Sequence, residues 1–184
     1  ADHIKLGPGG IREIEFMAQV FQLIRGGRDA ALQIRPTLKV LRLLVARRLL
    51  PLDSEQQLVS AYEFLRRLEH RLQYVDDAQT HMLPTGEENQ AQIARSMGFP
   101  DWPSMLAVLE THRQRVAQHF EDIFSNPEDG THALAGLWFE QSESDEALEE
   151  IGNLGFRHPK AMLERLHAFR QSAKYQQLAA SIRE

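Results

Sequence analysis

Apolar residues recur at steps of three and four along most of the chain, the spacing that places them on one face of an α-helix. Over residues 11–25 they fill most of the helix circumference, and Arg12, Glu15, Gln19 and Gln22 share one narrow polar stripe. Such a helix is expected to pack on several sides. Glu13 is the exception, because it is a charged residue within the apolar arc.

Further helices follow between clear turn signals. Pro36 starts the next helix and Pro51 stops it, and Asp53 or Ser54 then caps a long third helix. The polar and turn-forming run at 125–130 is the clearest boundary in the chain. The helices expected before this boundary cover residues 11–25, 37–50, 53–79, 87–97 and 101–124, and weaker ones lie near 132–138, 144–153 and 159–171 and from about residue 175.

These elements predict an all-α fold, because no stretch of useful length shows the alternation of a β-strand. We expect an antiparallel helical bundle over residues 1–125, associated with a neighbouring domain, and a linker at 126–130. Residues 131–184 are expected to supply additional C-terminal helices that begin the next helical segment and rest on the bundle.

The composition is that of an ordinary folded protein. The 184 residues are 42% apolar and carry a formal net charge of −5, and cysteine is absent. The absence of cysteine excludes disulfides and thiol catalysis, and the net charge gives no reason to expect DNA binding. No run reaches the roughly 20 apolar residues that a membrane span needs. The chain lacks an initiator methionine and a signal peptide and stops within a helical pattern, so we expect a soluble, cytoplasmic piece of a longer polypeptide.

Residues 5–10, Lys-Leu-Gly-Pro-Gly-Gly, form a loop directly before the first helix. Because a helix N-terminus favours anions, Lys5, Gly9, Gly10 and Arg12 are candidates for contact with a phosphate or nucleotide. However, the Gly-Lys-Ser/Thr ending of a Walker loop is missing, and so is the glycine spacing of a dinucleotide-binding turn. The alternative is a plain interdomain hinge.

Glu13 needs a partner if it faces the core, because a buried carboxylate must be paired, hydrogen-bonded or protonated. We expect it to pair with Arg67 or Arg71 of the third helix and so to fix the packing of the two helices. Two alternatives are a Glu13 exposed at the interface with a neighbouring domain and a direct catalytic role. The charge of Glu15 is explained by the helix dipole and by Arg12, three residues away on the polar stripe.

No metal or catalytic site is expected within this chain. His112 and His119 share a helix face but lie about 10.5 Å apart along the axis, too far for two ligands of one zinc ion. Asp76 and Asp77 lie in a predicted helix, where adjacent side chains point about 100° apart and make a poor joint site for a metal.

Clustered arginines suggest contact with an acidic partner. The ordinary alternative is a solvated helix face with carboxylates one turn away, as from Glu63 to Arg67. The two clusters are Arg42, Arg47 and Arg48, and the adjacent pair Arg66 and Arg67.

Three stretches together resemble one known family. They are residues 4–16 (Ile-Lys-Leu-Gly-Pro-Gly-Gly-Ile-Arg-Glu-Ile-Glu-Phe), residues 21–28 (Phe-Gln-Leu-Ile-Arg-Gly-Gly-Arg) and residues 61–73, continuing through Asp77, Gln79, Thr80, Leu83 and Pro84. This chain resembles the helical domain that follows the N-terminal nucleotidyltransferase domain of bacterial glutamine synthetase adenylyltransferase/adenylyl-removing enzyme. The similarity covers residues 3–125 strongly and 131–184 more weakly.

The resemblance implies a segment of a bifunctional enzyme of nitrogen regulation. In that family the N-terminal half removes AMP from glutamine synthetase by phosphorolysis and the C-terminal half adds AMP from ATP, under control of the PII signal protein. Mg²⁺ and ATP are implied for the full-length enzyme. The Gly-Ser and paired aspartates on a strand that the reaction needs are absent here, so the segment by itself is expected to be an inactive regulatory and scaffolding domain.

Two further interpretations stay open. One is a stand-alone helical module for protein interaction. An exposed apolar patch on the first helix would argue against this interpretation, because it would indicate that a neighbouring domain is missing. The other is the helical domain of a related uridylyltransferase.

Overall fold

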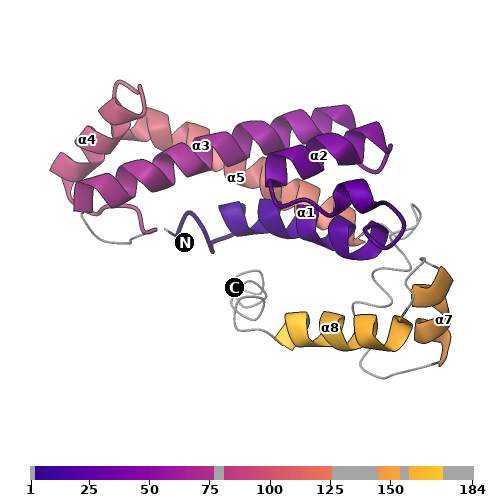
Figure 1. The fold of residues 1–184 in the computed structure, drawn as a ribbon. Coiled ribbons are helices and arrows are strands. Elements are labelled where there is room, and N and C mark those ends of the chain that lie inside the picture. The colour runs from indigo at the N-terminus through magenta and orange to yellow at the C-terminus, as the bar shows by residue number, and fades with distance from the viewer. Residues whose placement is uncertain (1–2, 77–80, 126–144, 154–157, 172–184) are drawn as a thin grey trace.

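The computed structural model describes residues 3–76, 81–125, 145–153 and 158–171 and confirms the all-α prediction (Figure 1). Within these residues no β-strand forms, and one isolated antiparallel bridge joins His3 to Met82. The elements are α1 (Ile11–Arg25), the 3₁₀ turn η1 (Ala30–Leu32), α2 (Thr37–Ala46), α3 (Leu52–Asp76), α4 (Glu87–Ser96), α5 (Trp102–Ser125), α7 (Asp145–Asn153) and α8 (Pro159–Gln171).

The main core lies between α1, α2, α3 and α5, with α4 closing one end. Its centre is a set of fully buried aliphatic side chains, including Ile14, Leu41, Leu65 and Met105. Helices α3 and α5 run side by side in opposite directions. Their register is marked by the Phe64 ring, which lies 4.8 Å from the ring of His112.

Helix α1 is buried on two sides, as its wide apolar arc predicts. One side joins the main core, and the other packs against α7 and α8 through Phe16, Val20 and Ile24. In α1 only Gln19 is classed as exposed. The helix therefore presents no apolar patch that would indicate a missing neighbour.

Helix α2 is shorter than predicted. It ends at Ala46 rather than continuing to Leu50, and Arg48 adopts a left-handed backbone with φ of 57°. The amide of Leu49 then donates to the carbonyl of Leu44 at 2.9 Å, and the turn carries Leu50 into the core, where its exposure is 6%. Burying Leu50 in the core thus stabilises the chain more than one further turn of α2 would.

Helices α7 and α8 form a second, smaller apolar cluster against α1. Ile151 and Leu163 are almost fully buried there. The predicted linker at 126–130 and the helices expected over 132–138 and from residue 175 lie outside the described residues. In the described part of the chain, no helix combines the length and apolar character required to cross a membrane.

Candidate functional site

The segment before α1 is held against the segment after α3. The amide of Ile4 donates to the carbonyl of His81 at 2.9 Å, and His3 forms its bridge with Met82 one residue further on. The ring nitrogen Nδ1 of His3 accepts from the amides of Lys5 and Leu6 at 3.2 and 3.0 Å. Residues 3–6 therefore have a defined path before the glycine loop begins.

The glycine loop, residues 7–10, packs directly on α5. Gly9 has a φ of 68°, which favours glycine, and a Cβ at this position would overlap the backbone of Arg113. The loop is mostly buried, with only Pro8 exposed. Both the conformation and the close approach require glycine at position 9.

The amides that a phosphate would need are already occupied. The amide of Gly9 donates to Oε2 of Glu13 at 3.0 Å, and the amide of Gly10 donates to the carbonyl of Gly7 at 3.0 Å. Those of Ile11 and Arg12 donate to the carbonyls of residues 4 and 5 at 3.2 and 3.1 Å. A phosphate at the predicted Gly9, Gly10 and Arg12 would therefore have to displace hydrogen bonds within the chain, including the one from Gly9 to the Glu13 carboxylate.

Glu13 is buried, with 2% exposure, but it does not pair with an arginine. Its hydrogen-bond partner is the amide of Gly9, whereas Arg67 and Arg71 are exposed on α3. The predicted ion pair is thus wrong, since the carboxylate points back to the loop before its own helix. Burial raises the pKa of Glu13 from its ordinary value of 4.5 to about 7, and the Gly9 hydrogen bond opposes this only in part.

The second buried carboxylate, Glu69 of α3, gathers the cations of the site. Its Oε2 accepts from Arg66 at 2.6 Å, and its Oε1 lies 3.3 Å from Nζ of Lys5 and 3.2 Å from Nδ1 of His81. Burial raises the pKa of Glu69, but the hydrogen bond and charge of Arg66, and then Lys5, outweigh it and lower the pKa overall. Lys5 therefore joins the segment before α1 to α3 through this ion pair.

Arg66 also links this cluster to α1. It lies 3.7 Å from Oε1 of Glu15, while Arg12 donates to Oε2 of Glu15 at 3.0 Å, as the spacing of the two residues predicts. The guanidinium of Arg66 also stacks over the ring of Tyr62, 5.4 Å from its centroid. We call Lys5, Arg12, Glu13, Glu15, Arg66, Glu69 and His81 together the N-terminal junction.

The burial of Glu69 could have been predicted from its spacing in the sequence, although a charged residue is not expected in a buried position. The residue lies four positions after Leu65 and three before Leu72, both of which are buried. It therefore belongs to the buried stripe of α3. The sequence does not show which side chains reach Glu69, because Lys5 and His81 come from segments far away in the sequence.

Glu69→Ala is expected to lower the free energy of unfolding by about 2 kcal/mol at neutral pH. Removing one partner of a buried ion pair typically costs about 3–5 kcal/mol, but water screens Lys5 and Arg66 in part, since their side chains are 30% and 37% exposed. The lowered pKa means that Glu69 stabilises the fold above its ordinary pKa. The loss should therefore shrink as the pH falls below about 4. Urea denaturation measures this.

The matched control is Glu63→Ala, which removes an exposed glutamate from the same helix. A change within about 0.5 kcal/mol is expected for it. Equal losses in the two variants would contradict a special role for Glu69.

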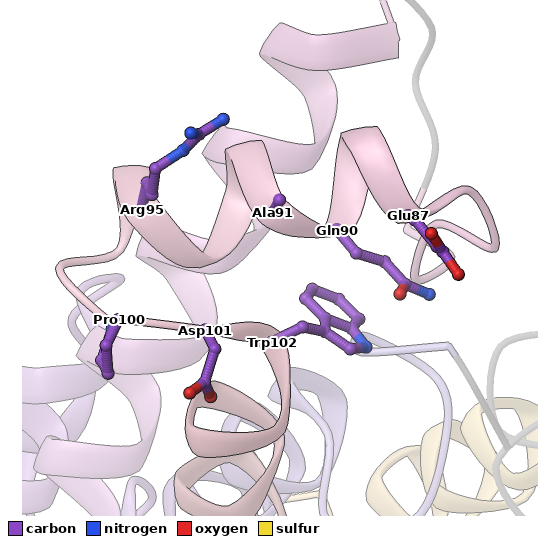
Figure 2. Close-up of a pocket in the computed structure, with 7 residues that line it drawn as sticks. All are labelled: Glu87, Gln90, Ala91, Arg95, Pro100, Asp101 and Trp102. Atoms are coloured by element: carbon purple, nitrogen blue, oxygen red, sulfur yellow. The ribbon is translucent and has the colours of Figure 1, made fainter.

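A shallow pocket between α4 and the start of α5 is not a convincing ligand site. Its volume is about 310 Å³, and Figure 2 shows the indole of Trp102 beneath α4 with Gln90 beside it. Gln90 already donates to a backbone carbonyl at 2.8 Å, and Asp101 accepts from an amide of α5 at 2.8 Å. Arg95 and Asp101 point in opposite directions, so the charged groups do not converge on a ligand.

The described residues also offer no constellation for a metal ion. No group of three or more potential ligands among histidine, aspartate and glutamate occurs in that part of the chain. His112 is buried beside Phe64, and His119 interacts with Gln57 at 3.1 Å. No metal site is therefore assigned among the described residues, and Asp77 lies outside them.

Comparison with known proteins places the chain in a family. Residues 1–124 match the family model described as GlnD PII-uridylyltransferase. The chain belongs to this family. The match covers the main bundle, including the whole N-terminal junction.

Several proteins with curated names are closely similar to the chain. It is 51% identical over 183 residues to the bifunctional glutamine synthetase adenylyltransferase/adenylyl-removing enzyme of Ralstonia nicotianae, a match covering 97% of this chain and 19% of the relative. The enzyme of the same name from Aromatoleum aromaticum is 52% identical over 155 residues, 84% of this chain and 16% of the relative. The enzyme of that name from Chromobacterium violaceum is 48% identical over 180 residues, which cover 97% of this chain and 20% of the relative.

The resemblance inferred from residues 4–16, 21–28 and 61–73 is thereby confirmed. This GlnD-family chain corresponds to a segment of those bifunctional enzymes and spans about a fifth of their length. Its similarity extends over nearly all of the chain, including the part with α7 and α8.

Proposed function

We propose that this chain is a helical scaffolding and regulatory segment in the adenylyl-removing half of a bifunctional glutamine synthetase adenylyltransferase. Its similarity to enzymes of that name over nearly the whole chain supports the proposal. The segment contributes position rather than chemistry. It buttresses a neighbouring nucleotidyltransferase domain and shapes its contact with glutamine synthetase and the PII signal protein.

The observation that carries the proposal is the set of contacts that hold the N-terminal junction together. Lys5 is bound to the buried Glu69, and Gly9 is packed on the backbone of α5. The chain therefore enters α1 along one fixed path. Because catalysis depends on holding reacting groups to within a fraction of an ångström, such a junction is suited to orienting a preceding catalytic domain.

The reaction chemistry is assigned to the neighbouring domain. Mg²⁺ and ATP serve the full-length enzyme there, and we expect neither to bind this segment. No adenylyl-removing turnover is expected from the chain alone. Neither DNA nor a membrane is proposed as a partner, in keeping with the net charge of −5.

The test replaces the corresponding segment of the Ralstonia nicotianae enzyme with this chain and assays both halves of the reaction on glutamine synthetase. The graft should remove AMP, and the chain alone should not. The double substitution Lys5→Met with Glu69→Leu in the graft should slow AMP removal by about tenfold and leave AMP addition unchanged, because only positioning is disturbed. Turnover by the chain alone, or an unchanged AMP removal rate in the double variant, would refute the proposal.

A role in a uridylyltransferase is the second candidate, because the matching family model carries that description. The same graft distinguishes the two when it is offered UTP with PII as acceptor. Uridylyl transfer or removal by the graft, with no adenylyl removal, would favour this alternative.

A further inference from the structure

Positive charge is concentrated at the end of the bundle formed by the end of α1, η1 and α2. Residues 25–48 contain seven of the 21 lysines and arginines of the chain but only one of the 26 aspartates and glutamates. The chain as a whole has a formal net charge of −5. We call these seven cationic side chains the basic end: Arg25, Arg28, Arg35, Lys39, Arg42, Arg47 and Arg48.

Tertiary contacts gather the basic end into one surface. Arg47, just after α2, donates to Asp29 at the start of η1 at 2.6 Å. Gln22 of α1 donates to the carbonyls of Leu32 and Ile34 at 2.6 Å each, which holds the loop against α1. In Figure 1 this loop and α2 lie at the end of the bundle away from α4.

Most of these cations have no carboxylate partner within the described residues. The two ion pairs there are the short one from Arg47 to Asp29 and a long one of 3.9 Å from Arg42 to Glu55. All the cations except Arg25 are exposed. Arg35 lies just before α2, and Lys39 and Arg42 are three residues apart on α2, so these two cations lie on one exposed face of the helix.

Local stability does not explain this arrangement. Lys39 lies in the first turn of α2, where the positive end of the helix dipole disfavours a cation. Arg48 takes a left-handed backbone, with φ of 57°, which costs a residue with a side chain about 1–2 kcal/mol. Two positions therefore carry a cation where another residue would stabilise the fold better.

We propose that the basic end is a docking surface for a carboxylate-rich protein surface, and that glutamine synthetase carries that surface. The identity of the partner rests on the proposed function. Six of the seven cations are arginines, which bind carboxylates through two parallel hydrogen bonds. Leu52, four residues after Arg48, is 59% exposed, and arginine beside an apolar side chain is typical of protein interfaces. A nucleic acid fits less well, because the rest of the chain is acidic.

The experiment compares two variants of equal charge. Arg28, Arg35, Lys39 and Arg48 are changed to glutamine in the basic-end variant. The matched control changes Arg67, Arg71, Arg95 and Arg115, which are also exposed and have no ion pair to a described residue. Binding of each chain to immobilised glutamine synthetase is measured at low and at physiological salt.

The basic-end variant should bind at least about tenfold more weakly than the wild type, and the control within about twofold, because the location of the charge decides the contact. Wild-type binding should weaken with salt, and poly-glutamate should compete. Equal weakening in both variants, or absence of binding by the wild-type chain, would overturn the proposal. Tighter binding to a short DNA duplex than to glutamine synthetase would identify a nucleic-acid surface instead.

Arg48→Gly separates docking from folding. Glycine relieves the left-handed backbone, so the melting temperature should rise while binding to glutamine synthetase weakens by about fourfold, beyond the change allowed for the control. A purely structural role for Arg48 cannot give this combination. If the graft removes AMP normally while the basic-end variant still binds, the docking surface alone is rejected and the proposed function stands.

Discussion

Replacing Gly9 by alanine should lower the free energy of unfolding by about 4 kcal/mol, because two costs combine. The left-handed backbone at φ of 68° costs about 1–2 kcal/mol for a residue with a Cβ, and forcing atoms into a packed site adds about 1–3 kcal/mol. The atoms in the way are the backbone of Arg113 in the middle of α5, which cannot rotate aside as a flexible side chain would. Chemical denaturation followed by circular dichroism measures the loss.

Gly98→Ala is the control for this experiment. Gly98 also has a positive φ, of 87°, but a Cβ there meets nothing within 4 Å. It should therefore show the backbone cost alone, about 1 kcal/mol. If both alanine variants lose the same stability, the close approach of the glycine loop to α5 is refuted.

Glu13→Gln should remove a pH dependence worth about 3 kcal/mol. The folded pKa of about 7 lies above the ordinary value of 4.5, so between these values the folded chain holds a proton that the unfolded chain has released. The native protein should therefore lose stability as the pH rises from about 4.5 to about 7, and little further above that. Glutamine cannot ionise and keeps an oxygen for the Gly9 amide, so the variant should match the wild type near pH 4 and exceed it near pH 8.

The quantity to measure is the difference in unfolding free energy between variant and wild type across this pH range. The difference matters because His3, His112 and His119, whose pKa values are lowered first of all by burial, titrate in both proteins. Glu88→Gln is the control, since Glu88 also lies in the first turn of a helix but is exposed. A variant that differs from the wild type by the same amount at every pH would show that Glu13 is ionised in the fold.

The helices were predictable because each is encoded locally. The apolar arc of residues 11–25 and the turn signals around residues 98–102 appear in the structure as α1 and as the start of α5. The end of α2 was not predictable to the residue, since Pro51 disfavours helix only directly before it and no local signal marks Arg48. Only the core, which takes up Leu50, decides that the backbone turns at Arg48.

The N-terminal junction was recognised by its residue types and, apart from the Arg12–Glu15 pair, not by its contacts. Lys5 was marked as a cation for an external anion, and the structure gives it Glu69 instead. Glu13 was correctly expected to be buried, but its partner is an amide of the loop rather than an arginine of α3. A polar group shows in the sequence that it needs a partner, but it does not show which of several nearby groups will reach it.

The sequence by itself determined the helical fold class, the positions of most helices and membership of the family, because periodicity, turn residues and the string at residues 4–16 are properties of neighbouring residues. Only the tertiary structure decided that the Gly9 amide donates to Glu13, that Lys5, Arg66 and His81 meet at Glu69 and that Arg47 reaches Asp29 across the basic end. Those outcomes depend on distances between residues far apart in the chain. Such distances are set by the packing of helices and not by any local pattern.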